Sequence, residues 1–330
     1  MDWGLIIENV VRAVFSPEVV AYGLAAIGIN VTFGYTGLLN FGQAGFMAVG
    51  AYGMAVSVEH FGWSMWVGIA IGLVLAVLLA LLMGVPTLRL RADYLAIVTI
   101  AAAEIIRLCV RSVTFGGLTG GSSGVNDFAD DFYDLNPFGR GRYGIGRYDY
   151  DERTFWVIVV GWTLIGLVSA LLWLLMRSPW GRVIKAIREN EDAVRSLGKN
   201  VFAYKMQSLV LSGVIGAFGG IMLAIARQSV QPDNYSRDIT FLCLTAVVLG
   251  GAARVQGPIV GAMLLWGLLQ FSDVALRQAK SAGLISDSIL ETNQTGVVRF
   301  MLVGTILAVL MVFRPQGIFG DRRELVFDAR

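Results

Sequence analysis

Three long apolar segments without charge constrain the fold of this chain more than any other feature. They cover residues 65–85, 154–176 and 206–226, and none of them contains a lysine, arginine, aspartate or glutamate. A helix needs roughly 20 apolar residues to cross the hydrocarbon core of a bilayer. Because lipid offers no hydrogen bonds, a crossing segment satisfies its backbone within its own helix. The sequence therefore predicts transmembrane α-helices at these three places.

Six shorter apolar stretches accompany these three: 18–35, 43–58, 94–106, 239–251, 257–271 and 300–313. Half-helices are tolerated at membrane depth where they are buried in protein. The break between 239–251 and 257–271 contains Gly250, Gly251, Gly257 and Pro258, which favours a broken or re-entrant pair. We predict an all-α, polytopic transmembrane bundle of about nine helices, within a range of eight to ten, some of them discontinuous.

Composition and motifs exclude several other classes. Only 15% of residues are charged, whereas soluble domains carry about 25%. A net charge of +2 gives no basic surface for nucleic acid. His60 is the single histidine, so we predict no zinc site and no Ser–His–Asp triad, and Cys109 and Cys243 are read as small apolar residues. The chain has no phosphate-binding G-x-x-x-x-G-K-[ST] motif. We expect a membrane protein without catalytic activity, metal or cofactor.

The distribution of lysine and arginine predicts the orientation. These residues are about twice as dense in one set of loops (36–42, 86–93, 177–205, 252–256 and the tail 314–330) as in the opposite set. The denser side is expected in the cytoplasm, with the N-terminus outside. We divide the chain into an N-terminal interfacial segment 1–17, one transmembrane domain 18–320 and a cytoplasmic tail 321–330. A frayed N-terminus is the alternative for the first segment.

Two hydrophilic segments interrupt the bundle. Segment 111–153 contains a group of aspartates (Asp127, Asp130, Asp131 and Asp134), and we predict an external loop, either a solvated excursion or a docking surface. Segment 177–205 holds seven basic and three acidic residues. Within it, Asn190 or Asp192 is placed to cap a short helix over Ala193–Leu197, and Gly198 suits the left-handed position that ends a helix. A solvated loop is the alternative to a helical lever.

Polar residues within apolar helices are the other candidates. Asn30, Thr32, Asn40 and Gln43 lie in a glycine-rich region, where unwound backbone could line a solute path, or where the side chains could simply bond neighbouring helices. Glu104 and Arg107 are three residues apart on one helix face, so a structural ion pair is expected.

Several blocks of sequence resemble the branched-chain amino acid permeases of the LivM type. In segment 177–205, Asp192-Ala193-Val194 followed by Gly198 resembles the E-A-A-x-x-x-G coupling motif of ATP-binding-cassette (ABC) importers. Further similar blocks, in order, are GYTGLLNFGQAGFMAVGAYG (34–53), RADYLAIVTIAAAEIIR (91–107), GLTGGSSG (117–124), SPWGR (178–182), AIREN (186–190), SLG (196–198), VVLGGAARVQGPIVGA (247–262) and FRPQGIFG (313–320).

The resemblance covers roughly residues 20–320 and implies one half of an importer that takes up leucine, isoleucine and valine across the bacterial inner membrane. It implies a LivH-type permease, two ATPase subunits and an external binding protein as partners. It also implies an ATPase-coupling role for Arg188, Glu189, Asp192, Ala193 and Gly198. The same class of importer with another cargo, such as urea, a short amide or another amino acid, stays open, and an ion-coupled transporter is the more distant alternative.

Overall fold

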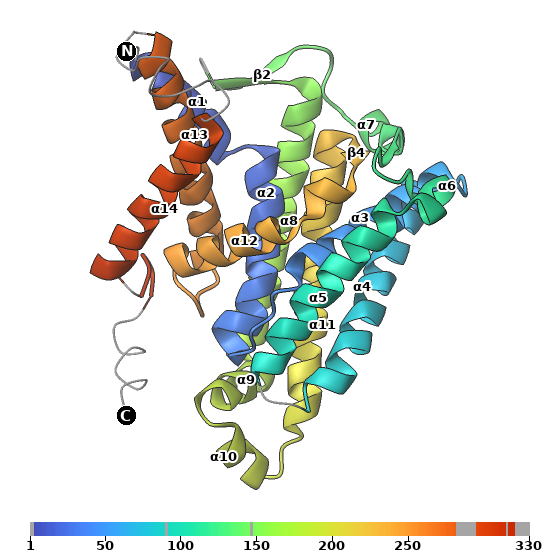
Figure 1. The fold of residues 1–330 in the computed structure, drawn as a ribbon, viewed down its shortest axis with the longest axis vertical. Helices are drawn as coiled ribbons and strands as arrows, with labels where there is room; N and C mark the ends of the chain where they lie inside the picture. Colours follow the sequence, from blue (N-terminus) through green and yellow to red (C-terminus); the bar gives the residue numbers. More distant parts are fainter. Residues whose placement is uncertain (1–2, 90–91, 146–147, 282–294, 315, 321–330) are drawn as a thin grey trace.

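The computed structural model describes residues 3–89, 92–145, 148–281, 295–314 and 316–320 (Figure 1). Each of the nine predicted apolar stretches coincides with a helix. These are α2 (Pro17–Ile29) continued by the π-helix η1 (Asn30–Thr36), α3 (Gln43–Glu59), α4 (Met65–Thr87), α5 (Ala92–Arg111), α8 (Glu152–Arg177), α11 (Val201–Arg227), α12 (Arg237–Gly250), α13 (Gly257–Ser281) and α14 (Thr295–Phe313). The prediction of an all-α polytopic bundle with discontinuous helices is confirmed.

Five of these helices in the described part of the chain are long and apolar enough to cross a bilayer: α2 with η1, α4, α8, α11 and α13. The helix α12 has 14 residues, which at about 1.5 Å per residue is shorter than the roughly 30 Å hydrocarbon core. It is therefore half of the broken pair that the glycines between 239–251 and 257–271 predicted.

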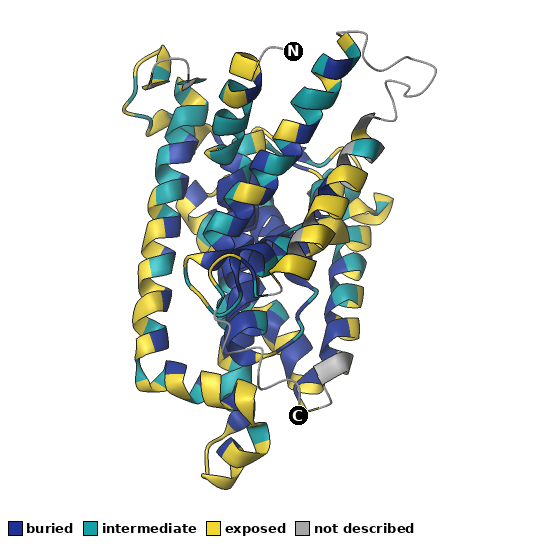
Figure 2. Ribbon diagram, turned by 90° about the vertical axis from the view of Figure 1, so that its left-hand side faces the viewer, coloured by how far each residue is buried: buried dark blue, intermediate teal, exposed yellow. Residues whose placement is uncertain are grey.

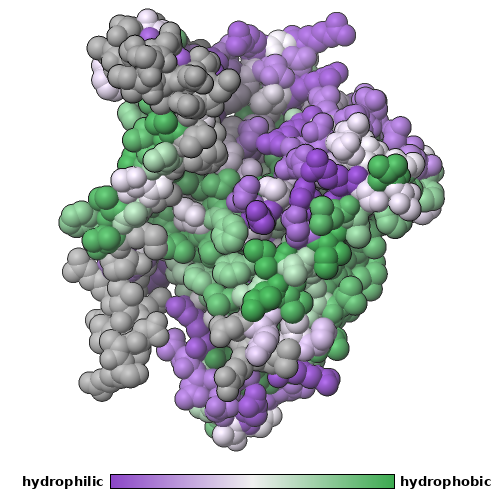
Figure 3. Space-filling model, in the orientation of Figure 1, coloured by the Kyte–Doolittle hydropathy of each residue, from purple (hydrophilic) through white to green (hydrophobic). Residues whose placement is uncertain are grey.

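The centre of the bundle is formed by α2 and α11. In the most apolar stretch of α2 with η1, 94% of the residues are buried, and in that of α11, 72% are buried. The corresponding share is 33% for each of α4, α8 and α13. Figure 2 shows this contrast as a dark core between outer helices with exposed faces. On the surface, Figure 3 shows a hydrophobic band across the middle with hydrophilic residues towards both ends. Because an exposed apolar band of this kind is stable only in lipid, the chain is a multi-pass membrane protein.

Shorter elements cover the two ends of the bundle. They are α1 (Trp3–Val14), the 3₁₀ turns η2 (Val113–Phe115) and η3 (Pro232–Tyr235), α6 (Gly116–Thr119), α7 (Asp130–Asp134), α9 (Pro179–Glu189) and α10 (Glu191–Ser196). Two antiparallel strand pairs join them: β1 (Val125–Asn126) with β4 (Ser229–Val230), and β2 (Arg142–Ile145) with β3 (Tyr148–Asp151). The strands are additions that the sequence did not predict.

Segments predicted on one side of the membrane meet at one end of the structure. Val125 pairs with Val230, and the Asp131 carboxylate accepts a hydrogen bond from the backbone N of Met65 (3.3 Å). The helices α9 and α10 lie at the opposite end (Figure 1). The relative placement of segments 111–153 and 177–205 follows the predicted orientation, and which end faces the cytoplasm stays a prediction.

The β2–β3 hairpin ties α1 to the bundle. Asp149 lies 2.7 Å from the guanidinium of Arg12 and 2.6 Å from that of Arg142. Next to it, Asp151 caps α8 by accepting a hydrogen bond from the backbone N of Thr154 (3.2 Å). Partial burial raises the pKa of the Asp151 carboxyl, but the hydrogen bonds from Thr154 and from the backbone of Asp151 and Arg153 together outweigh burial and hold that pKa below its ordinary value. The hairpin and cap together set where α8 begins.

Close contact between α12 and α13 depends on glycine, and this gives a first prediction. A Cβ atom on Gly261 would lie 1.8 Å from the carbonyl oxygen of Ala246. Replacing Gly261 by Ala must therefore separate the two helices, and overpacking of this kind costs about 1–3 kcal/mol. We expect a clear drop in the thermal unfolding temperature of the purified protein. Gly166→Ala on α8, where a Cβ meets no atom within 4 Å, is the matched control, and equal shifts for both variants would contradict the close packing.

Candidate coupling site

Two short helices, α9 and α10, form an arm that leaves the bundle where α8 ends (Figure 1). The helix α8 stops at Arg177, and Pro179 occupies the first position of α9. Proline suits that position because its fixed φ is helical and because an N–H at the start of a helix has no partner within the helix, so that its loss costs nothing. The same proline cannot continue α8, so the chain turns at Ser178. The local sequence thus ends α8 and begins α9 at this corner.

The corner between α9 and α10 is built by two local signals. Asn190 is extended (φ −157°), and its side-chain oxygen accepts a hydrogen bond from the backbone N of Ala193 (3.0 Å). Gly198 has φ +75° and follows the end of α10. Both roles agree with the sequence prediction, although α10 begins at Glu191 and is therefore slightly earlier than the predicted Ala193–Leu197.

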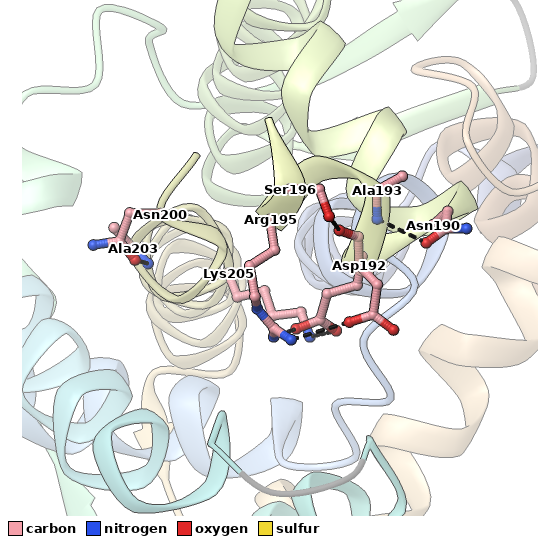
Figure 4. Close-up of polar contacts among 9 residues, drawn as sticks. Asn190, Asp192, Ala193, Arg195, Ser196, Asn200, Ala203 and Lys205 are labelled. Atoms are coloured by element: carbon pink, nitrogen blue, oxygen red, sulfur yellow. Dashed lines mark hydrogen bonds and ion pairs between the residues drawn. The ribbon is translucent and has the colours of Figure 1, made fainter. Parts of the chain in front are cut away.

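A small network of ion pairs fixes α10 against α11 (Figure 4). The guanidinium of Arg195 lies 2.8 Å from Glu191 and 3.0 Å from Asp192, and Glu191 also pairs with the ammonium group of Lys205 on α11. The Lys205 side chain is 12% exposed, so this pair is less screened by water than the pairs on the surface. The ion pairs of Glu191, Arg195 and Lys205 were not predicted from the sequence. The i,i+4 spacing of the first two was a usable signal.

One buried apolar side chain from each helix completes the corner. Ile187 on α9, Val194 on α10 and Val201 on α11 form a separate small cluster, each at most 5% exposed. Because these side chains lie at the meeting point of three helices, the arm is a packed unit and not a solvated loop.

The far side of the arm is exposed and faces away from the bundle. Leu197 is 79% exposed, and Glu189 is exposed at the end of α9. Beside α10 lies a cavity of ≈ 530 Å³, lined by charged residues that include Arg89, Asp192 and Lys199. An exposed apolar tip beside a charged groove is suited to docking a soluble protein.

The arm reaches into the bundle through Arg188. Its Nη1 atom donates a hydrogen bond to the carbonyl oxygen of Gly34 (2.7 Å) in η1. Gly37 ends η1 with φ +73°, and a Cβ there would lie 3.2 Å from Cγ of Arg188. A π-helix leaves carbonyl groups outside the regular α-helical ladder and is frequent at functional sites. The arm is therefore bonded directly to the irregular end of the central helix.

The same π-helix holds two other parts of the bundle. The Asn30 side chain accepts a hydrogen bond from the backbone N of Ala253 (2.9 Å) and donates one to the carbonyl of Arg254 (2.8 Å), in the loop between α12 and α13. The Thr36 hydroxyl shares a hydrogen bond of 2.5 Å with Ser208 on α11. The π-helix η1 thus connects the arm, the broken pair and α11.

Residues 17–310 match the family model described as branched-chain amino acid transport system / permease component. This chain belongs to that family. It is 29% identical over 309 residues to the high-affinity branched-chain amino acid transport system permease protein LivM of Escherichia coli K12, covering 90% of this chain and 67% of that protein. It is 25% identical to the probable LivM permease of Methanocaldococcus jannaschii, covering 91% of each.

Among solved structures, the chain is similar to a transporter described as of the metal-chelate ABC type in an inward-facing conformation. The TM-score is 0.46 at 16% identity, covering 92% of this chain and 85% of that one.

The permease buries all four residues predicted along the solute path. Asn30, Thr32, Asn40 and Gln43 are each at most 2% exposed. Gln43 donates hydrogen bonds to the carbonyls of Ala25 (3.2 Å) and Ser212 (3.3 Å), so it joins α3 to α2 and α11. The Thr32 hydroxyl donates to the carbonyl of Ile29 within its own helix (3.1 Å). The structure shows helix-joining roles for Asn30 and Gln43, and a role in the path stays a prediction.

Asn40 differs from the other three. Its Oδ1 atom accepts a hydrogen bond from the backbone N of Gly42 (2.9 Å), whereas its Nδ2 atom is buried and finds no partner among the described residues. An unsatisfied buried donor is costly. Among the four predicted path residues, Asn40 is therefore the one whose side chain keeps a buried donor atom without a partner in the described part of the chain.

Glu104 and Arg107 form the expected pair at the other end of the bundle. Their closest atoms are 2.6 Å apart, and Arg107 also lies 3.0 Å from Asp233, which in turn pairs with Arg111. The pair is thus part of a charge network that fixes the end of α5 to η3, as a structural role requires.

The bonds of Asn30 give a second prediction. Asn30→Ala leaves the N–H of Ala253 and the carbonyl of Arg254 without this partner, and because both hydrogen bonds are part-buried, the loss of each costs about 1 kcal/mol. We expect the loop to loosen, so that a cysteine placed at Val255, which is half-buried against the core, reacts at least about tenfold faster with a maleimide. Thr163→Ala on the exposed face of α8 is the control. An unchanged labelling rate in Asn30→Ala would show that this bond does not hold the loop.

Proposed function

We propose that this chain is one membrane half of an ABC importer that carries leucine, isoleucine and valine into the cell by alternating access. The observation that carries the proposal is the arm: a packed helix–cap–helix unit with an exposed tip, bonded through Arg188 to the π-helix of the central helix. Membership of the branched-chain amino acid permease family and the names of its relatives support the cargo.

The exposed arm at one end of the bundle suggests where the partner subunits bind. Two ATPase subunits bind the cytoplasmic ends of the two permeases, with α10 in the contact, and a LivH-type permease forms the other half. An extracytoplasmic binding protein delivers the solute at the end that carries segment 111–153. The arm, the tail 321–330 and the C-terminus are then cytoplasmic, and the N-terminal segment 1–17 is outside, in a bacterial inner membrane.

The mechanism uses the contacts in sequence. When the ATPases close on ATP, they move α10, and the apolar cluster of Ile187, Val194 and Val201 carries α9 with it. Arg188 transmits this displacement to η1, and Asn30 passes it to the loop between α12 and α13. A change between two packed arrangements at this point opens the bundle to one side or the other. Arg188, Glu189, Asp192, Ala193 and Gly198 are the proposed coupling residues, and Asn30, Thr32, Asn40 and Gln43 the proposed path residues.

Uptake of radiolabelled leucine tests the cargo. Cells with and without this chain are compared before and after ATP depletion, with unlabelled isoleucine, valine, alanine and urea as competitors. We expect ATP-dependent uptake that requires the chain and is reduced by isoleucine and valine. Competition by urea or alanine alone would replace the cargo but keep the importer. Uptake that survives ATP depletion and follows an ion gradient would contradict the ABC mechanism.

A further inference from the structure

A large basic cavity lies beside the arm and shares no lining residue with the charged groove of α10. Its volume is ≈ 620 Å³, and its walls come from α8, α9, η1, the loop between α12 and α13, and Phe319. Three cationic side chains line it: Arg177, Lys185 and Arg254. Among the described residues that line the cavity, none is acidic. The cavity therefore attracts an anion.

The local contacts of two of these cations preserve their charge. The guanidinium of Arg177 lies 3.7 Å from the ring centroid of Trp173, and the ammonium group of Lys185 lies 5.9 Å from that of Tyr35. An aromatic ring orients a cation and carries no net charge of its own. Ser169, which also lines the cavity, has a buried hydroxyl oxygen that finds no hydrogen-bond partner among the described residues. The site thus combines positive charge with an available hydroxyl.

The position of the cavity indicates the source of the anion. The cavity lies at the C-terminal end of α8. The preceding turns of α8 have an exposed apolar face at Leu167, Leu171 and Leu174. In a bilayer this face contacts acyl chains, and Trp173, 45% exposed, is the kind of residue that lies at headgroup level. Basic pockets at this depth bind the phosphates of anionic lipids.

We propose that this cavity is a binding site for the phosphate of an anionic membrane phospholipid. The phosphate accepts hydrogen bonds from Arg177, Lys185 and Arg254, while the acyl chains lie along the exposed face of α8. The same cavity is bounded by Tyr35 of η1 and by the loop that Asn30 holds. A bound lipid therefore joins α8, α9 and this loop, and stabilises the arrangement that connects the arm to the bundle. The site does not depend on the cargo proposed above.

Native mass spectrometry of the full-length chain, purified with the subunits that accompany it, tests the site. The probes are phosphatidylglycerol, phosphatidylcholine as a zwitterionic lipid, and inorganic phosphate. We expect phosphatidylglycerol to be retained in preference to phosphatidylcholine and not to be displaced by inorganic phosphate. Lys185→Gln should weaken this retention about fivefold, and Arg177→Gln with Lys185→Gln about 25-fold, because each surface cation contributes about 1 kcal/mol.

The control is Arg182→Gln, which removes one charge from an exposed position of α9 outside the cavity, and Lys185→Arg should restore retention. Lys185 is exposed, so its replacement leaves the folded bundle intact if the double variant does not fold. Equal retention of the two lipids, or equal effects of Lys185→Gln and Arg182→Gln, would overturn the proposal. Displacement of the lipid by inorganic phosphate would keep an anion site but reject a lipid as its occupant.

Discussion

Arg188→Ala is expected to lower leucine transport and substrate-stimulated ATP hydrolysis by about 10- to 100-fold, with the protein still in the membrane. The arm contacts η1 through the hydrogen bond from Arg188 to the carbonyl of Gly34. A hydrogen bond from a charged donor contributes about 1.5–3 kcal/mol, and its loss lets the arm move without η1. Transport by the reconstituted importer and ATP hydrolysis, measured with and without leucine, check this result.

Two further variants separate the bond from the charge. Arg182→Ala removes a cation from the same helix at an exposed position, and we expect transport within about twofold of the unchanged protein. Arg188→Lys keeps the charge but lacks the planar fork of donors, so an intermediate loss is expected. If Arg188→Ala and Arg182→Ala behave alike, the contact between arm and η1 does not transmit the motion.

The second large effect is expected at Gly198. Its φ of +75° is in the left-handed region, and a Cβ there would meet no atom within 4 Å. The cost of a side chain is therefore conformational, about 1–2 kcal/mol for an ordinary residue and more for a β-branched one. We expect Gly198→Val to reduce coupled transport about tenfold, and deletion of residues 190–198 to abolish it.

Asparagine is the matched replacement at this position, because it tolerates the left-handed region better than other residues. Gly198→Asn should keep transport within about twofold of the unchanged protein. The amount of each variant in the membrane is measured alongside, to separate coupling from folding. Equal losses for Val and Asn would mean that the backbone conformation of Gly198 is not what matters.

Part of the coupling site could be predicted from the sequence. Asn190 caps the start of α10 and Gly198 follows its end, and both act on neighbours a few residues away along the chain. Their roles could therefore be predicted from the sequence alone. The nine apolar stretches could also be predicted, because the composition of each segment decides whether it is stable in lipid. The fold class followed from these local properties.

Contacts between distant segments could not be predicted in this way. Arg188 meets Gly34, and Lys205 meets Glu191, only because helices far apart in sequence pack together. The π-helix at Asn30–Thr36 could not be predicted from its own composition. It is held by contacts with distant segments, namely the hydrogen bond from Arg188 and the hydrogen bonds to the loop after α12. Asn30 and Gln43 were recognised as buried polar groups, but their partners were visible only in the structure.

A photo-crosslinking amino acid at Leu197 tests whether α10 is the contact for the ATPase. Leu197 is 79% exposed at the tip of the arm, so the probe replaces no buried contact. Illumination of intact membranes should join this position to an ATP-hydrolysing subunit, whereas the same probe at Leu167 on the exposed face of α8 should not. A product with the ATPase only at Leu197 is the predicted result. No such product at Leu197, or a product with an extracytoplasmic protein, would contradict the account.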